Sequence, residues 1–237
     1  MTIALLFVLT AFIIVVGWYA LPFLVRRRSE SLLRDKVRGS LVLSYDDGPG
    51  TDLTAELLDL LDAENLRATF FMIGDAAAAR PDRVAEVLAR GHEVGSHTQS
   101  HSNAWKVPPL RAIRDMRAGR VTVDALGGDG TLFRPPYGKL TLGTLAAAAG
   151  WRLAWWSIDP RDSWAPRPID EVLAEVEAAQ GGVILLHDFD KPRRDQLSPS
   201  DHHDYVLEMT RRLILLAKQK GWAVRTMGDL MRDGADV

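Results

Sequence analysis

The chain has 237 residues, 47% hydrophobic and 25% charged, which is enough for one large domain or two small ones. Its net charge of -2 lacks the basic excess that a nucleic-acid partner requires, so we expect no nucleic-acid binding. The absence of cysteine excludes a disulfide, a zinc–thiolate site and a thiol nucleophile.

The first part of the chain is apolar. No charged side chain occurs from Thr2 to Val25, and about 20 apolar residues suffice to cross a bilayer. Trp18 and Tyr19 would lie at the membrane–water interface. We therefore expect residues 1–25 to be a retained single-pass transmembrane helix and lipid anchor. A cleaved signal peptide or a buried core helix fits this pattern less well.

Residues 26–39 form a basic linker after this segment. Its basic residues are Arg26, Arg27, Arg28, Arg34, Lys36 and Arg38, whereas no basic side chain precedes the apolar run. The positive-inside rule therefore predicts a protein of the plasma (inner) membrane with its remaining residues on the cytoplasmic face.

From residue 40 onward, short β-rich runs alternate with amphipathic helical segments. The expected strands are 41–46, 68–74, 92–98, 131–137, 152–159, 182–188 and 222–227. Such alternation predicts parallel strands with right-handed helical crossovers. The spacing allows a small or incomplete (β/α) barrel or an open doubly wound sheet. The only long irregular stretch is 188–204, and long loops in compact domains are often functional.

Polar residues follow the apolar part of most of these strands. They are Asp46, Asp47, His97, Arg134, Asp159 and His187. Because the carboxyl ends of parallel strands open on one face, these side chains are expected to meet in one cleft.

Two histidines have the spacing of metal ligands. His97 and His101 would share one face of a helical turn and could hold one metal ion, although two surface histidines explain the pattern equally well. Either Asp46 or Asp47 could complete a His–His–Asp ligand set. The other acid would then remain as a base beside the metal.

Three further residues could take part in chemistry at the same place. Arg134 could keep a neighbouring carboxylate ionised, and the Pro-Pro turn that follows could fix the backbone N–H of Tyr137 as an oxyanion donor. His187, at the end of a buried strand, could act as a general acid, with an acid from the segment "WSIDPRDSW" holding its proton.

The order of these motifs resembles a known family. "SYDDGPG", "SHTQSH", "FRPPYG", "DPRDSW" and "ILLHD" are similar to the five successive motifs of the family 4 carbohydrate esterases, the polysaccharide deacetylases. The resemblance covers roughly residues 40–230, within a catalytic domain expected at residues 40–237. It implies an α/β fold, a distorted (β/α)7–8 barrel with roughly seven parallel strands, and metal-dependent removal of an N-acyl group from an amino sugar.

The resemblance also implies a role for each motif residue. Asp46 would be the catalytic base, and one divalent ion would be held by Asp47, His97 and His101. That ion would be Zn²⁺, with Co²⁺, Ni²⁺ or Mn²⁺ as alternatives.

The remaining motifs would complete the site. Arg134 would orient the base, Tyr137 would offer its backbone N–H, and His187 would be the acid, tuned by Asp162. Pro135, Tyr137 and Trp164 would contact the substrate. The family's fourth motif usually has its aspartate directly before the tryptophan, and here Ser163 intervenes, so Asp159 is a rival of Asp162.

Several functions remain open at this point. The favoured substrate is a lipid-linked amino sugar on a polyprenyl phosphate, which suits a cytoplasmic site at a membrane. The basic residues Lys191, Arg193 and Arg194 could meet that phosphate, although a solvated run of charges explains them better. The alternatives are peptidoglycan or an exported N-acetylglucosamine polymer, O-acetyl groups on xylan or similar polymers, and glycan binding without turnover.

Overall fold

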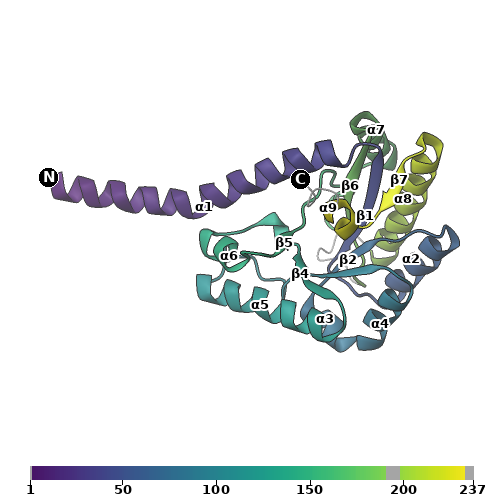
Figure 1. Cartoon of the computed structure of the whole chain (residues 1–237), viewed down its shortest axis with the longest axis horizontal. Helices are drawn as coiled ribbons and strands as arrows, with labels where there is room; N and C mark the ends of the chain where they lie inside the picture. Colours follow the sequence, from purple (N-terminus) through teal and green to yellow (C-terminus); the bar gives the residue numbers. More distant parts are fainter. Residues whose placement is uncertain (1, 191–197, 233–237) are drawn as a thin grey trace.

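The computed structural model describes residues 2–190 and 198–232, which fold into an α/β domain preceded by a long helix (Figure 1). The strands are β1 (Ser40–Asp46), β2 (Thr69–Met72), β3 (Glu93–Ser96), β4 (Asp129–Phe133), β5 (Arg152–Leu153), β6 (Gly181–His187) and β7 (Ala223–Arg225). The helices are α1 (Thr2–Lys36), α2 (Asp52–Ala63), α3 (Gly74–Ala79), α4 (Pro81–Ala89), α5 (Pro109–Ala125), α6 (Leu142–Ala147), α7 (Ile169–Ala179), α8 (Pro199–Lys220) and α9 (Met227–Arg232). All seven expected strands are present, most of them shorter than predicted.

Every strand pairing within the described residues is parallel, as the sequence predicts. The strand order is β5-β4-β3-β2-β1-β6, and β7 also pairs with β1. The carboxyl-terminal half of β1 pairs with β2, whereas its first three residues pair with β7, so β2 and β7 share one edge of β1. The central strand β1 is therefore surrounded on both sides, and each of its seven residues is buried.

The segment after β5 brings the two ends of the sheet together. The strand predicted at 152–159 is regular only over Arg152–Leu153. Beyond it, Ile158 forms a parallel bridge with Ile184 of β6, and Ser157 N–H donates to the carbonyl oxygen of Val183 over 3.0 Å. This short bridge closes the sheet irregularly, so the fold is a distorted (β/α) barrel.

Side-chain alternation along the strands separates the barrel interior from the layer beneath the helices. Leu41, Leu43 and Tyr45 of β1 pack with apolar residues of α2 and α8 in one core cluster, whereas Val42 belongs to a second cluster. Because successive strand side chains point to opposite faces, Asp46 lies on the same side as Val42. The period of β1 thus directs this carboxylate into the barrel, at the end of the strand.

Helix α1 extends away from the domain at its N-terminal end and packs against α6 with its middle, where Trp18 lies next to Gly143 (Figure 1). Within the part of the chain whose side chains the structure describes, no helix is long and apolar enough to cross a bilayer. The prediction of a transmembrane segment at residues 1–25 is therefore not confirmed.

The predicted long loop at 188–204 is only partly described. Its last residues already belong to α8, which begins at Pro199, so the irregular stretch is shorter than expected. Lys191, Arg193 and Arg194 lie outside the described residues, and their predicted contact with a phosphate stays a prediction.

Candidate active site

The predicted metal ligands converge at the carboxyl end of β1 and β3. The Nε2 atom of His101 lies 3.1 Å from Oδ1 of Asp47, and Nε2 of His97 lies 3.5 Å from the same oxygen. The three potential ligand atoms all lie within 4.8 Å of one another. Two imidazole nitrogens and one carboxylate oxygen form a donor set that suits Zn²⁺, Co²⁺ or Ni²⁺ and leaves coordination positions open.

The hydrogen bonds of His97 prepare it to act as a ligand. Its Nδ1–H faces the carbonyl oxygen of Arg134 at 2.7 Å, which leaves the lone pair on Nε2 directed at Asp47. Burial lowers the pKa of His97 to about 4. The ring is therefore neutral at physiological pH, as metal binding requires.

The two histidines do not share a helical turn, contrary to the sequence-based reasoning. Residues 97–103 contain no helix, and both Thr98 and His101 adopt positive φ angles, of 64° and 57°. Two residues in the left-handed region reverse the chain after β3 and return His101 toward His97, whose ring centroid is 4.9 Å away. The spacing of four residues is thus satisfied by a loop.

The second acid of the pair, Asp46, is held by a buried arginine. Arg134 Nη1 donates to Oδ1 of Asp46 over 2.7 Å and to Oγ of Ser44 over 2.9 Å. Arg134 is fully buried, and its guanidinium lies 4.1 Å from the ring centroid of Phe71. Burial raises the pKa of Asp46, and the positive charge of Arg134 opposes this effect without cancelling it. Asp46 is therefore an oriented carboxylate of increased basicity.

His187, at the end of β6, is paired with Asp162. Its Nδ1 lies 2.9 Å from Oδ1 of Asp162, and its backbone N–H donates to Oδ2 of the same carboxylate over 2.9 Å. Burial by itself lowers the pKa of His187, but the Asp162 carboxylate outweighs it and raises the pKa to about 10. Although burial raises the pKa of Asp162, the charge of His187 lowers it to about 2. The carboxylate of the rival, Asp159, instead accepts from the backbone N–H of Arg161.

These groups line one cavity of about 580 Å³. Its walls are formed by Asp46, Asp47, His97, His101, Tyr137, Lys139, Trp156, Asp159, Ser163, Trp164, Leu185 and His187. Tyr137 is 50% exposed and Trp164 is 44% exposed, so both rings are available at its rim. Tyr137 has a positive φ of 58° within a short 3-10 turn. Pro135 is buried and does not line the cavity, so the structure does not place it in contact with substrate.

Sequence reasoning missed a contact between α1 and the rim of this cavity. Arg26 Nη1 donates to the carbonyl oxygen of Gly138 over 2.6 Å, and its guanidinium carbon lies 4.9 Å from the ring centroid of Trp156. Glu30, one turn along α1, accepts from Arg26 Nε over 2.6 Å. The sequence predicts the linker charges only as a basic flank, and no local signal links residue 26 to residue 138.

Two buried residues beside the site were also missed. Asp188 accepts from Thr54 Oγ1 over 2.7 Å, and its carboxylate lies so close to Gly48 that a side chain at that position would collide with it. His202 of α8 lies 3.3 Å from Oδ2 of Asp162. The sequence analysis assigns no role to either residue. An acid directly after His187, at the end of an apolar run, is the signal that could have pointed to Asp188.

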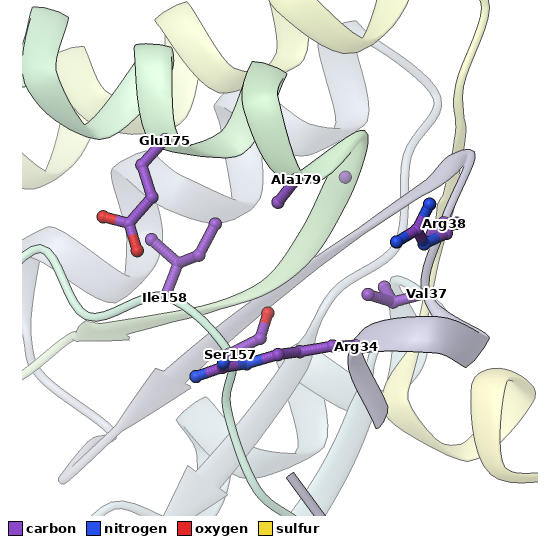
Figure 2. Close-up of a pocket in the computed structure, with 8 residues that line it drawn as sticks. Arg34, Val37, Arg38, Ser157, Ile158, Glu175 and Ala179 are labelled. Carbon is purple, nitrogen blue, oxygen red and sulfur yellow. The ribbon is translucent and has the colours of Figure 1, made fainter. Parts of the chain in front are cut away.

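A second cavity, of about 270 Å³, lies between the end of α1 and helix α7 (Figure 2). Arg34 runs alongside Ser157 on one side, and Glu175 of α7 lies on the other. None of the residues that line this cavity belongs to the His–His–Asp cluster or to the His187–Asp162 pair. The chemistry is therefore concentrated in the larger cavity at the carboxyl ends of the strands.

A distorted (β/α) barrel with a His–His–Asp cluster, an arginine-bound aspartate and a histidine–aspartate pair defines a class of hydrolytic enzyme. The comparisons with known proteins place the chain within that class. The model of the family described as polysaccharide deacetylase matches residues 34–154, just over half of the chain. The chain belongs to the polysaccharide deacetylase family, which confirms the resemblance seen in its motifs.

Two curated relatives cover most of the chain. A chitooligosaccharide deacetylase of Bradyrhizobium sp. (strain ANU 289) is 32% identical over 203 residues, which are 81% of this chain and 90% of the relative. A peptidoglycan-N-acetylglucosamine deacetylase of Bacillus cereus is 32% identical over 198 residues, which are 81% and 88% of the two chains. The prediction of a carbohydrate deacetylase enzyme is thus confirmed at the level of the family.

A solved structure with the same fold is the chitin deacetylase from the fungal pathogen Colletotrichum lindemuthianum. It superposes with a TM-score of 0.68 at 28% sequence identity and covers 81% of this chain and 87% of its own.

Proposed function

We propose that the protein is a metal-dependent deacetylase that removes the N-acetyl group from N-acetylglucosamine residues of an oligosaccharide or a cell-wall glycan. The observation that carries this proposal is the meeting of the His–His–Asp cluster, Asp46 and the His187–Asp162 pair in one cavity. Amide hydrolysis needs a base for the attacking water and an acid for the leaving amine, and groups suited to both roles line the cavity.

Asp47, His97 and His101 would hold the metal ion. When bound, such an ion acidifies a water molecule and polarises a carbonyl oxygen. The donor set fits Zn²⁺ because the tautomer of His97 is fixed by the Arg134 carbonyl and its ring is neutral. Co²⁺, Ni²⁺ and Mn²⁺ are the alternatives.

Asp46 would accept the proton of the attacking water. Its raised pKa makes it a stronger base than an exposed carboxylate. The bond from Arg134 occupies Oδ1 and leaves Oδ2 facing the metal cluster, 3.7 Å from Nε2 of His97. The backbone N–H of Tyr137, on the cavity wall, would donate to the oxygen of the tetrahedral intermediate, a contribution that is typically worth about 10²–10³ in rate.

His187 would deliver the proton that the departing amine requires. Its Nδ1–H is held by Asp162, which leaves Nε2 to transfer the proton. With a pKa of about 10, His187 is protonated across the physiological range, as an acid must be at the start of the step. Asp162, rather than Asp159, is therefore the residue that we assign to the tuning of His187.

The substrate class is supported by the rim of the cavity and by the curated relatives. Tyr137 and Trp164 expose aromatic rings of the kind that stack on sugar faces, and the relatives act on chitooligosaccharide and peptidoglycan. We favour N-acetylglucosamine polymers as the substrates for this reason. A lipid-linked amino sugar, the substrate favoured by the sequence alone, remains the second candidate, because the uncharged run at Thr2–Val25 and the basic linker favour a location at the cytoplasmic face of a membrane.

The decisive experiment is acetate release by the purified full-length protein. Chitopentaose, peptidoglycan and a polyprenyl-phosphate-linked N-acetylhexosamine would be compared before and after removal of metal by a chelator. We expect metal-dependent release that Asp46→Asn abolishes and that the surface control Asp82→Asn leaves intact. Metal-free activity, or full activity of Asp46→Asn, would contradict the proposal, and binding of the glycan without any release would support a non-catalytic role.

The side of the membrane on which the catalytic domain lies is tested separately, by thiol labelling. The chain has no cysteine, so a single Glu171→Cys variant reports on the exposed surface of α7. Protection from a membrane-impermeant reagent until the membrane is opened is expected for a cytoplasmic domain. Labelling of cells whose inner membrane is intact would place the domain on the opposite side.

A further inference from the structure

A buried histidine from α8 contacts the carboxylate that holds the catalytic acid. Nε2 of His202 lies 3.3 Å from Oδ2 of Asp162, and the His202 side chain is 1% exposed. Asp162 is itself fully buried and accepts hydrogen bonds from the ring and the backbone of His187. One carboxylate therefore links two imidazoles, of which only His187 reaches the cavity.

The ring of His202 is fixed by its neighbours. Phe189 stacks on it with a centroid distance of 4.6 Å and an interplanar angle of 5°. Phe189 also contacts the ring of His187, with a centroid distance of 5.7 Å and an angle of 59°. The three rings and the carboxylate form one packed group beneath the catalytic cavity. Since α8 packs against β6, His202 reaches this group from the outer layer of the barrel.

We propose that His202 is a positioning residue for the catalytic acid: by donating to Asp162, it holds the carboxylate in the orientation that aims the His187 proton at the leaving amine. This inference rests on the proposed deacetylase function. It adds a third member, from a distant helix, to the His187–Asp162 pair.

The physical reason lies in how the carboxylate is held. Oδ1 of Asp162 accepts from the His187 ring, and Oδ2 accepts from the His187 backbone and from His202. Without His202, every hydrogen bond that the described residues give to the Asp162 carboxylate would come from His187, the residue that Asp162 must orient. Rotation of the carboxylate would then carry the imidazole with it. A hydrogen bond from a donor on a separate element, α8, restrains the rotation of the carboxylate independently of His187. It also takes up part of the carboxylate's charge, so that His187 releases its proton more readily.

The test exploits the different needs of two leaving groups. An amine must be protonated as it departs, whereas p-nitrophenolate leaves without a proton. We therefore compare kcat and KM for chitopentaose and for p-nitrophenyl acetate in the metal-loaded full-length protein. His202→Phe retains a ring that can stack on Phe189 and removes the donor. His202→Gln retains a donor of similar reach, His202→Asn carries one that is too short, and His203→Phe is the matched control on the same helical turn.

We expect His202→Phe and His202→Asn to lower kcat for chitopentaose by about tenfold, with KM unchanged. This is the lower end of the loss that is typical when a hydrogen-bond partner behind a metal-binding histidine is removed. Their kcat for p-nitrophenyl acetate should remain close to wild type, and His202→Gln and His203→Phe should be close to wild type on both substrates. The comparison of Gln with Asn carries the test by itself if the Phe variant does not fold.

Three results would overturn the inference. Equal losses on both substrates would show that His202 supports the fold or the metal site in general. An equal loss in Gln and Asn would show that its donor is irrelevant, and no loss in any variant would show that it has no part in the step. If the wild-type protein hydrolyses p-nitrophenyl acetate but releases no acetate from chitopentaose, the proposed function fails, and the role of His202 fails with it.

Discussion

Replacing Asp162 with asparagine should change the pH range in which the enzyme works. In the native protein the Asp162 carboxylate raises the pKa of His187 to about 10 against the opposing effect of burial. Asparagine keeps the size and one acceptor of the side chain but removes its charge. The pKa of His187 should then fall toward its ordinary value of 6.5, because Asp162 is the largest of the charges that oppose burial, whereas Asp47 and Asp46 still raise the pKa.

The size of the effect follows from the protonated fraction of His187. At pH 8 a group with a pKa of about 10 is about 99% protonated, whereas one with a pKa of 6.5 is about 3% protonated. Amide hydrolysis at pH 8 should therefore fall by up to about 30-fold, and activity should recover as the pH is lowered toward 6. The loss on the basic side is the expected direction, since an acid acts only while it carries its proton.

The assay is kcat/KM for chitopentaose deacetylation from pH 5 to pH 10. The basic limb of the profile should lie near pH 10 in wild type and at clearly lower pH in Asp162→Asn, while the acidic limb, set by Asp46, should move little. Asp159→Asn is the matched control, because the Asp159 carboxylate accepts from Arg161 and makes no hydrogen bond to His187 in the described structure. A basic limb that stays in place in Asp162→Asn, or moves in Asp159→Asn, would refute the assignment.

Three further substitutions test other parts of the site. Arg134→Met leaves the buried Asp46 charge without its partner, so we expect a loss of about 3–5 kcal/mol in the free energy of unfolding, measured by denaturant titration, together with loss of activity; unchanged stability would contradict the buried ion pair. His101→Ala removes one ligand, so Zn²⁺ titration by calorimetry should give weaker binding, and an unaltered affinity would exclude His101 from the metal site. Arg26→Ala frees the Gly138 carbonyl next to Tyr137, and kcat should fall several-fold with Zn²⁺ affinity unchanged; equal kcat would show that α1 does not support the rim.

Much of this site could be predicted from local sequence. The run "LVLSYD" has the length and apolar character of a buried strand, and the period of two along it places Asp46 on the interior face with Val42. The strand-end positions of His97, Arg134 and His187 follow from the same reasoning, because parallel strands present their carboxyl ends on one face. These features depend on short-range patterns and on one topological rule.

The geometry of the metal ligands depended on backbone conformations that the spacing does not reveal. A separation of four residues predicted a helical turn for His97 and His101, whereas the chain uses left-handed residues at Thr98 and His101. Both routes bring two imidazoles together. The meeting of His97 and His101 was therefore predictable from their spacing, and the local structure that brings them together was not.

What the sequence by itself determined is the succession of strands and helices along the chain and the set of chemically active side chains at the strand ends. Only the tertiary structure decided that Asp162 rather than Asp159 meets His187, that His202 meets Asp162 from a helix 40 residues away, and that Arg26 reaches Gly138 across 112 residues. The physical reason is that periodicity and propensity act within a few residues of the chain. Contacts between elements depend on how the barrel closes and on which helices cover it, and these are properties of the whole packed domain.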